Sequence, residues 1–248
     1  VDPVNGAIQT DTAVYAAADK FLVENDMWKR SILATSVDSA ANETVAFQVI
    51  LQAKGKALTD VGVKVGDLEA FKGDAVIKAD PNVQLYRLWY VGAGTPRRRA
   101  AIPLGVKDAG SGFQGEVCMP LKDPFGDKFN IPAADNAVPD QKYQSVWVDL
   151  YVPRGTAAGT YIGKITITAK EFAKPVELTL WLGVRPFELP NEPTFITELN
   201  RYHAVAGWAG VNWNDPERAR KVTWDYYRLA HAHRCTLNVL PYSHSSRM

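Results

Sequence analysis

The sequence predicts a mainly β protein, with an antiparallel β-sandwich over residues 1–190 and the start of an incomplete (β/α)8 barrel over residues 191–248. Apolar and polar residues alternate through most of the first 190 residues, and Gly and Pro turns separate the runs. After Pro190 the pattern changes to strand, helix and strand. The remaining residues are far fewer than the roughly 250 of a complete barrel. We therefore expect the second domain to be truncated, or to be completed by the rest of its own barrel or by a partner chain.

Within the first domain, residues 44–52 show the alternation most clearly. Val45, Phe47, Val49 and Leu51 fall on one face of an extended chain. Thr44, Gln48 and Gln52 fall on the other face, where Ile50 is the exception. This pattern is typical of a half-buried strand. Residues 146–152 are almost continuously apolar or aromatic, as expected for a strand covered on both faces. Similar runs predict further strands at residues 61–66, 83–91, 162–169 and 176–185.

Two segments of the first domain have no clear periodicity. Residues 11–30 suit either a helical turn around Ala16 to Ala18 or edge strands. Residues 109–144 carry repeated Gly and Pro residues and predict a long loop. A loop of this length in a compact domain is usually functional or packed on itself.

The second domain follows the linker Pro190-Asn191-Glu192-Pro193. Residues 195–200 predict a strand, and residues 236–240 predict another. Between them, Asp215 suits a helix N-cap and Pro216 suits the first helical position. A strand–helix–strand unit of this length requires the two strands to be parallel. Apolar residues recur at helical spacing at Ala219, Val222, Tyr226, Leu229 and Ala230.

Composition excludes several classes of protein. Hydrophobic residues make up 46% and charged residues 22% of the 248, which is typical of a globular protein and argues against disorder. The net charge of +1 argues against a nucleic-acid or anionic-lipid partner. The sequence contains no run of 18 apolar residues, so it predicts no membrane-spanning helix. The first residues lack a signal-peptide pattern and an initiator Met, so we expect the numbering to begin at a mature or trimmed end.

Cysteine content and short motifs narrow the chemistry further. Cys118 and Cys235 are too few for a disulfide framework, and we expect two separate small apolar side chains rather than a bridge. The basic run of residues 97–99 follows a Gly-Thr-Pro turn and is expected to be solvated. The sequence contains no phosphate loop, dinucleotide-binding motif, Gly-x-Ser-x-Gly or His-Glu-x-x-His.

Several short motifs resemble one known family in the order in which they occur. Residues 42–49, 145–155 and 158–167 resemble the N-terminal sandwich of glycoside hydrolase family 123-like proteins. Residues 185–190 resemble the exit from that sandwich. Residues 227–234, with Asn238 to Pro241, resemble the first βα turn of the barrel that follows.

The resemblance implies a secreted or periplasmic carbohydrate-active protein whose partner is carbohydrate. Members of the family remove N-acetylhexosamine residues, and the acetamido group of the substrate acts as the nucleophile. An adjacent Asp-Glu pair orients that group and supplies the general acid. The sequence contains no Asp-Glu dipeptide. We therefore expect the pair to lie beyond Met248, assign no catalytic residue, and expect this chain alone to be inactive.

Barrel enzymes build their sites where the parallel strands end. Glu198 or Asn200 is suited to hydrogen-bond a sugar hydroxyl, and an aromatic ring after either strand is suited to stack on a sugar face. Two Trp residues in a Gly-rich loop suit a sugar platform, or packing over the helix. Strand capping and loop packing explain the same residues without a ligand. The candidate substrate-binding residues are Glu198, Asn200, Tyr202, His203, Trp208, Trp213, Tyr242 and His244.

No cofactor is expected, although two weaker metal hypotheses stay open. Asp123, Asp127 and Asp135 suit calcium, which prefers oxygen ligands. Their spacing does not fit an EF-hand, and turn formation explains them equally well. The four histidines allow a zinc site, yet His231 and His233 are two residues apart on a helix and do not face each other.

Two functions fit the sequence. The first is the N-terminal part of a secreted glycoside hydrolase-like protein, in which the sandwich supports a barrel. The second is a structural or adhesive extracellular β-sandwich protein with an assembly role, whose edge strands pair with neighbours. A further run of βα units carrying an acidic pair would favour the first function.

Overall fold

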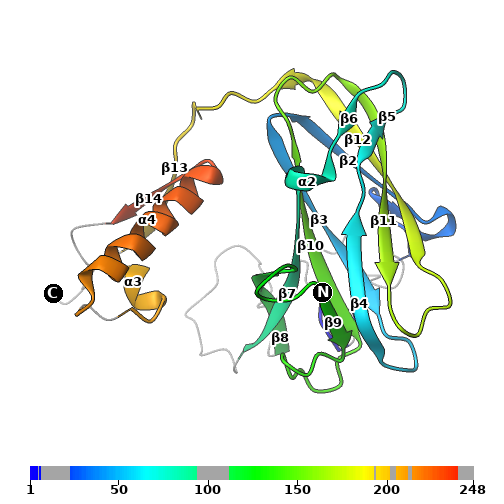
Figure 1. Ribbon diagram of the computed structural model, residues 1–248, viewed down its shortest axis with the longest axis horizontal. Coiled ribbons are helices and arrows are strands. Elements are labelled where there is room, and N and C mark those ends of the chain that lie inside the picture. Colours follow the sequence, from blue (N-terminus) through cyan, green and yellow to red (C-terminus); the bar gives the residue numbers. More distant parts are fainter. Residues whose placement is uncertain are drawn as a thin grey trace, which may run out of the picture. The chain divides into compact units, whose positions relative to one another are not determined.

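The computed structural model describes residues 1–4, 6, 23–93, 112–192, 194–201, 205–211 and 214–239. The chain divides into two units, Val1–Leu189 and Pro190–Met248. The first unit contains two β-sheets, and the second contains a pair of strands with helices (Figure 1). No helix in the described part of the chain is long and apolar enough to cross a membrane.

The larger sheet of the first unit contains eight strands among the described residues, and its main path runs in the order β1-β2-β12-β11-β4-β9. Two short strands, β5 and β6, extend it beside β11. The bounds are β1 Trp28–Lys29, β2 Ala34–Ala41, β4 Leu58–Val65, β5 Leu68–Ala70, β6 Val76–Ile77, β9 Lys128–Ile131, β11 Gly159–Thr168 and β12 Val176–Glu188. We call it the eight-stranded sheet.

Most neighbouring strands in the eight-stranded sheet are antiparallel, as the sequence predicts, but β2 and β12 run parallel. Ala34 lies opposite Thr179, and Val37 lies opposite Leu182. Strands joined by a tight hairpin must be antiparallel. Because β2 and β12 come from opposite ends of the unit, no hairpin constrains their relative direction.

The smaller sheet of the first unit is antiparallel throughout its described strands and has the order β3-β10-β7-β8. We call it the four-stranded sheet. Its strands are β3 Glu43–Gln52, β7 Val83–Ala93, β8 Gly112–Pro120 and β10 Tyr143–Val152. Two short helical segments, η2 Arg30–Ile32 and α2 Ala79–Asn82, belong to the same unit.

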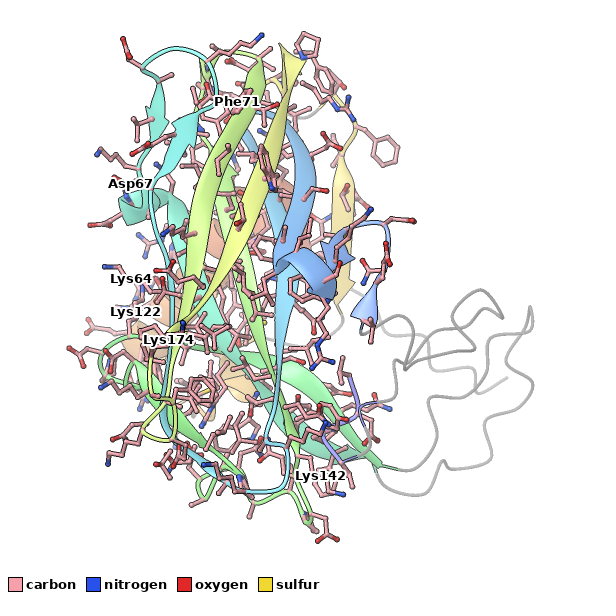
Figure 2. All side chains as sticks on the ribbon, turned by 90° about the vertical axis from the view of Figure 1, so that its right-hand side faces the viewer. Lys64, Asp67, Phe71, Lys122, Lys142 and Lys174 are labelled. Carbon is pink, nitrogen blue, oxygen red and sulfur yellow. The ribbon has the colours of Figure 1, made fainter. Side chains whose placement is uncertain are left out.

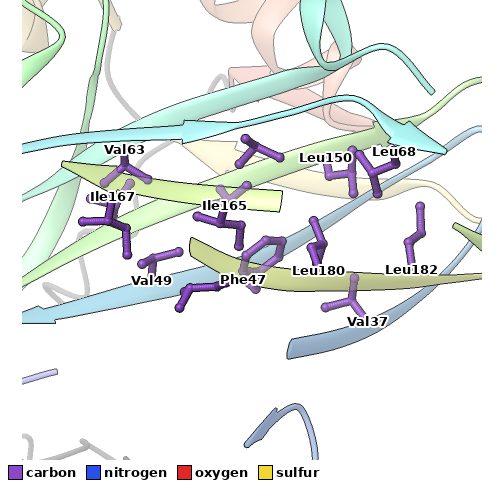
Figure 3. Close-up of a cluster of buried hydrophobic side chains, with 14 of the residues drawn as sticks. Val37, Phe47, Val49, Val63, Leu68, Leu150, Ile165, Ile167, Leu180 and Leu182 are labelled. Atoms are coloured by element: carbon purple, nitrogen blue, oxygen red, sulfur yellow. The ribbon is translucent and has the colours of Figure 1, made fainter. Parts of the chain in front are cut away.

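The hydrophobic core fills the space between the two sheets (Figure 3). Phe47 and Val49 of β3 belong to one buried cluster with Ile165 of β11 and Leu180 of β12. Full burial of such a side chain contributes about 1.5–3 kcal/mol to folding. The strong inward-facing alternation of these strands therefore fixes both the faces of the sheets and their register.

The alternation predicted for residues 44–52 is confirmed, except that Val45 is only half-buried. In β10 the inward-facing positions are fully buried, as Val148 and Leu150 illustrate. On the other face of β10, Trp147 and Tyr151 are half-buried rather than covered. The prediction of a strand covered on both faces is therefore correct for one face and too strong for the other.

The prediction of a long loop at residues 109–144 is wrong in part, because the segment contains β8 and β9. In β8, a side chain at Gly115 would lie 3.2 Å from Leu88, so a glycine interrupts the pattern that would reveal a strand. In β9, Phe129 and Ile131 are buried and alternate with polar residues. This strand has only four residues, which is too short to show a period.

The described part of residues 11–30 begins at Val23, and it includes the edge strand β1. The helical alternative around Ala16 to Ala18 lies outside the described residues, as does the basic run of residues 97–99.

Strand β7 separates from β10 toward its C-terminal end, and buried polar side chains fill the gap. The register between the two strands ends where Arg87 lies opposite Val146. Beyond that point the Tyr90 hydroxyl accepts a hydrogen bond from the Ser145 amide at 3.1 Å. Asn136 pairs with the backbone of Tyr90, because its Oδ1 accepts from the amide at 2.7 Å and its Nδ2 donates to the carbonyl at 2.8 Å.

Gln144 completes this arrangement with a fully buried side-chain amide. Its Nε2 donates to the carbonyl of Leu88 at 2.8 Å and to that of Ser145 at 3.0 Å. Its Oε1 accepts from Nε2 of Gln141 at 3.1 Å. Buried polar groups need such partners, because an unpaired one costs about 1–3 kcal/mol. The amide of Gln144 therefore replaces the backbone ladder that β7 and β10 no longer form.

Candidate functional site

The second unit contains the strand–helix–strand element that the sequence predicts. Its elements are β13 Thr197–Arg201, α3 Val205–Trp208, α4 Pro216–Ala232 and β14 Cys235–Val239. The two strands are parallel and in register from Thr197 opposite Cys235 to Arg201 opposite Val239. The carboxyl ends of both strands therefore lie at the same edge, which is where barrel and open α/β proteins place their ligands.

Local signals explain where α4 begins and ends. Oδ1 of Asp215 accepts a hydrogen bond from the Arg218 amide at 3.0 Å, and Pro216 occupies the first helical turn. Both features are favourable because the first amides of a helix have no intrahelical partner. Beyond the C-cap His233, Arg234 has a φ of 58°, in the left-handed region that ends helices. The predicted N-terminus of the helix is confirmed.

The apolar face predicted for α4 is only partly covered. Ala219 packs in a small buried cluster with Ala206 and Val211, and Val222 lies against that cluster. Leu229 is 55% exposed, although its spacing predicts burial. The two strands and two helices among the described residues of this unit cover only part of that face. The helical spacing of the apolar residues therefore does not by itself mark a buried position at Leu229.

A groove of about 600 Å³ lies between α3 and α4. Trp224 is 62% exposed there, and its ring centroid lies 6.4 Å from that of Tyr227. This groove was not predicted from the sequence. The signal available is helical spacing, since Arg220, Thr223, Trp224 and Tyr227 share one face of α4. The groove is lined by Ala206, Pro216, Ala219, Arg220, Thr223, Trp224 and Tyr227.

The structure places some of the candidate substrate-binding residues. Glu198 is exposed on β13, and Asn200 lies two residues further along, opposite Asn238 of β14. Successive residues of a strand alternate between faces, so Glu198 and Asn200 occupy the same face of β13. Asn238 was not singled out as a candidate, and its register position beside Asn200 near the strand ends is what draws attention to it.

The other candidates are not tested by the described residues. Trp208 is the last residue of α3, and its side chain is not described. The remaining five lie outside the described ranges: Tyr202, His203, Trp213, Tyr242 and His244.

Charged side chains on α4 are paired locally. Asp225 accepts hydrogen bonds from Lys221, at 2.9 Å, and from Arg228. These two hydrogen bonds, with that from Lys221 the larger influence, hold the pKa of Asp225 below its ordinary value. All three side chains are substantially exposed, so the pairing orients them along the helix surface and adds little stability.

The metal hypotheses receive no support from the described residues. Asp135 forms a two-point ion pair with the buried Arg87, whose Nη1 lies 3.0 Å from Oδ1. The hydrogen bonds from Arg87 lower the pKa of Asp135. In the described ranges no group of three His, Cys, Asp or Glu side chains is placed to hold a metal, so Asp123 and Asp127 gain no third ligand there. His231 and His233 are both exposed.

The two cysteines are free thiols, as expected from their number. Cys118 is exposed on β8, and Cys235 is half-buried at the start of β14.

Comparisons with known proteins identify the first unit. A family profile described as "Glycoside hydrolase 123 N-terminal domain" matches residues 24–169. Among solved structures, the chain is similar to a family 123 glycoside hydrolase from Clostridium perfringens, studied for the hydrolysis of glycolipid glycans, with a TM-score of 0.63 and 15% identity. That match covers 82% of this chain and 32% of the enzyme, so this chain spans about a third of the enzyme's length.

Two further solved structures match at a TM-score of 0.31, which is too low to support an argument about fold or function. One is the CooA pilin subunit from enterotoxigenic Escherichia coli, with 12% identity over 62% of this chain and 90% of the pilin. The other is AvmM, which catalyses macrocyclization in alchivemycin A biosynthesis, with 14% identity over 62% of this chain and 87% of AvmM. No curated protein matches this chain.

Proposed function

Because this chain belongs to the family of the glycoside hydrolase 123 N-terminal domain, we propose that it forms the N-terminal part of a secreted glycoside hydrolase that acts on N-acetylhexosaminides. The family match over residues 24–169 is the observation that carries the proposal. The likeness to the Clostridium perfringens enzyme supports the same fold. Its study concerns glycolipid glycans, which is consistent with a glycan substrate here.

In this proposal the second unit is the first βα unit of a barrel. A parallel sheet is normally covered on both faces and extends over several strands. The second unit has two parallel strands, with Leu199 48% exposed on β13 and Leu229 55% exposed on α4. Further βα units would cover these apolar surfaces. The sandwich, which precedes the barrel in the sequence, would then support it.

The substrate site would lie at the shared carboxyl edge of β13 and β14. Asn200 and Asn238 lie opposite each other near the carboxyl ends of these strands, and Glu198 lies two residues before Asn200 on β13. These residue types carry two amides and a carboxylate. Such groups hydrogen-bond sugar hydroxyls and the acetamido group of an N-acetylhexosamine. They position substrate in this proposal and carry no proton transfer. We assign neither the general acid nor its carboxylate partner to these 248 residues, which contain no Asp-Glu dipeptide.

The test combines intact mass with activity. The protein is purified from its natural source and its mass is measured. It is then assayed with the 4-nitrophenyl β-glycosides of N-acetylglucosamine and N-acetylgalactosamine. We expect a mass well above 27.3 kDa and release of 4-nitrophenol by at least one substrate. Residues 1–248 produced alone serve as the control and should be inactive. A source protein of 27.3 kDa, or a larger one inactive on both glycosides, would contradict the proposal and favour a structural role.

A further inference from the structure

The outer face of the eight-stranded sheet carries an exposed aromatic pair. Trp181 of β12 is 37% exposed, and Phe71, just after β5, is 63% exposed. Their ring centroids lie 6.3 Å apart and the ring planes are inclined by 55°. The Phe71 amide donates to the carbonyl of Thr160 at 2.7 Å, which fixes the Phe71 main chain beside β11. In Figure 2 this sheet faces the viewer and Phe71 is labelled near its upper end.

A glycine on β12 leaves room for a carboxylate near Trp181. Gly183 follows Trp181 by two residues, so both positions belong to the same face of β12. Asp38 of β2 lies opposite Gly183 in the sheet register. A Cβ atom at Gly183 would clash with Oδ1 of Asp38. The carboxylate of Asp38 therefore occupies the space above β12 where another residue would carry its side chain.

The carboxylate is oriented by a neighbouring cation. Nη2 of Arg185 lies 3.1 Å from Oδ2 of Asp38, and both side chains are more than half exposed. Oδ2 therefore faces Arg185, whereas Oδ1 faces the position above Gly183. Ser36 of β2 lies directly opposite Trp181 and adds an exposed hydroxyl. Trp181 therefore has the Ser36 hydroxyl opposite it and the Asp38 carboxylate one register position further along the same face, and Arg185 contacts that carboxylate.

The spacing of these groups fits a single sugar ring. Residues two apart on a strand are separated by about 6.6 Å, so the carboxylate over Gly183 lies about that far along the strand from Trp181. A pyranose presents a face of C–H groups and a rim of hydroxyls. We propose that this surface binds a neutral pyranoside of a glycan, with the C–H face stacked on Trp181, a ring hydroxyl donating to Oδ1 of Asp38, and Phe71 forming a side wall.

The charged groups argue against a protein partner at this surface. A protein that covered Trp181 would also remove Asp38 and Arg185 from water, and the desolvation of such a pair can exceed the attraction between the charges. A sugar leaves both groups hydrated and replaces only one or two water hydrogen bonds with hydroxyls. All residues of this surface belong to the first unit. A test of sugar binding here is therefore independent of the proposed barrel and its activity.

The experiment measures binding by the 248-residue chain, wild type and variants. Fluorescently labelled protein is applied to an array of neutral hexosides and N-acetylhexosaminides, and the strongest probe is titrated by calorimetry. We expect Trp181→Ala to weaken binding at least tenfold and Asp38→Ala at least threefold. Trp224→Ala removes an exposed Trp from the second unit and should leave affinity within twofold. Gly183→Ala should act like Asp38→Ala, since the added methyl displaces the carboxylate.

Each outcome decides the inference. Thermal unfolding and far-UV circular dichroism establish that every variant is folded, as expected for exposed substitutions. Failure of the wild-type chain to bind any probe, or unchanged binding by Trp181→Ala, would overturn the inference. Loss of binding only in Trp224→Ala would move the sugar site to the groove of the second unit and overturn it as well. None of these outcomes depends on hydrolysis, so the proposed activity is judged separately.

Discussion

Replacing the buried Gln144 by Met should lower the free energy of unfolding by about 2–4 kcal/mol. Met has a similar volume and keeps the core filled, so the effect of the change is the loss of polar contacts. The amide makes three hydrogen bonds, and each contributes about 1 kcal/mol. The carbonyl of Leu88 and the Nε2 of Gln141 would also lose a buried partner. Since domains are typically stable by about 5–15 kcal/mol, the loss is large.

Guanidinium chloride unfolding, followed by tryptophan fluorescence and circular dichroism, measures this effect. The matched control is Gln48→Met, because Gln48 is exposed on β3 in the same sheet. The control should change stability by less than about 0.5 kcal/mol. An unchanged slope with a lower midpoint is expected for Gln144→Met. A loss below about 1 kcal/mol, or one equal to that of the control, would refute the role assigned to the buried amide.

Three further changes have defined outcomes. Asp215→Ala should weaken the start of α4 by about 1 kcal/mol, seen as faster hydrogen exchange of the Arg218 amide; an unchanged rate would argue against the cap. The pKa of Asp135 is lowered by its arginine partner, so its stabilisation is present at neutral pH and disappears as the pH falls through the lowered folded-state pKa. In urea unfolding, the difference between Asp135→Asn and wild type should therefore shrink as the pH is lowered from 7 into the acid range, and a difference that stays constant would contradict this. Gly163→Ala should cost about 1–3 kcal/mol, because the added Cβ would lie 2.8 Å from a core leucine side chain. Thermal unfolding measures this effect. In the control variant Gly66→Ala the added Cβ would lie 3.8 Å from the carbonyl oxygen of Lys164, so this variant should unfold within a few degrees of wild type.

The sequence predicted the strands whose inward face is aliphatic along its whole length. In β11, Ile165 and Ile167 alternate with polar residues, and the structure buries both. Strand β8 was not predicted, because it is an edge strand and Gly115 interrupts its alternation of side chains. The pairing of β2 with β12 also could not be predicted, since it joins distant segments and leaves no local pattern. The periodicity of a strand indicates which of its side chains are buried, but it does not indicate which strands pair with it.

The candidate site was predictable to the extent that local chemistry fixes it. Asp215 and Pro216 mark the start of α4 because capping is a local interaction. The exposure of Leu229 was not predictable, because burial depends on which other elements pack against the helix. Gln144 offered a usable signal, since it is in phase with the buried Val146 and Val148, yet a glutamine is normally read as a surface residue.

The parallel pairing of β2 with β12 has a consequence for the order in which the protein is made. Strand β2 leaves the ribosome early, but its neighbour β12 is the last strand of the first unit to be synthesised. Until then β2 and β11 each lack the strand that separates them, and unpaired edges recruit other chains. The sandwich can therefore close only after synthesis has passed Glu188. A nascent chain that stops before Val176 would therefore expose one unpaired edge of β2 and one of β11, and such edges favour aggregation.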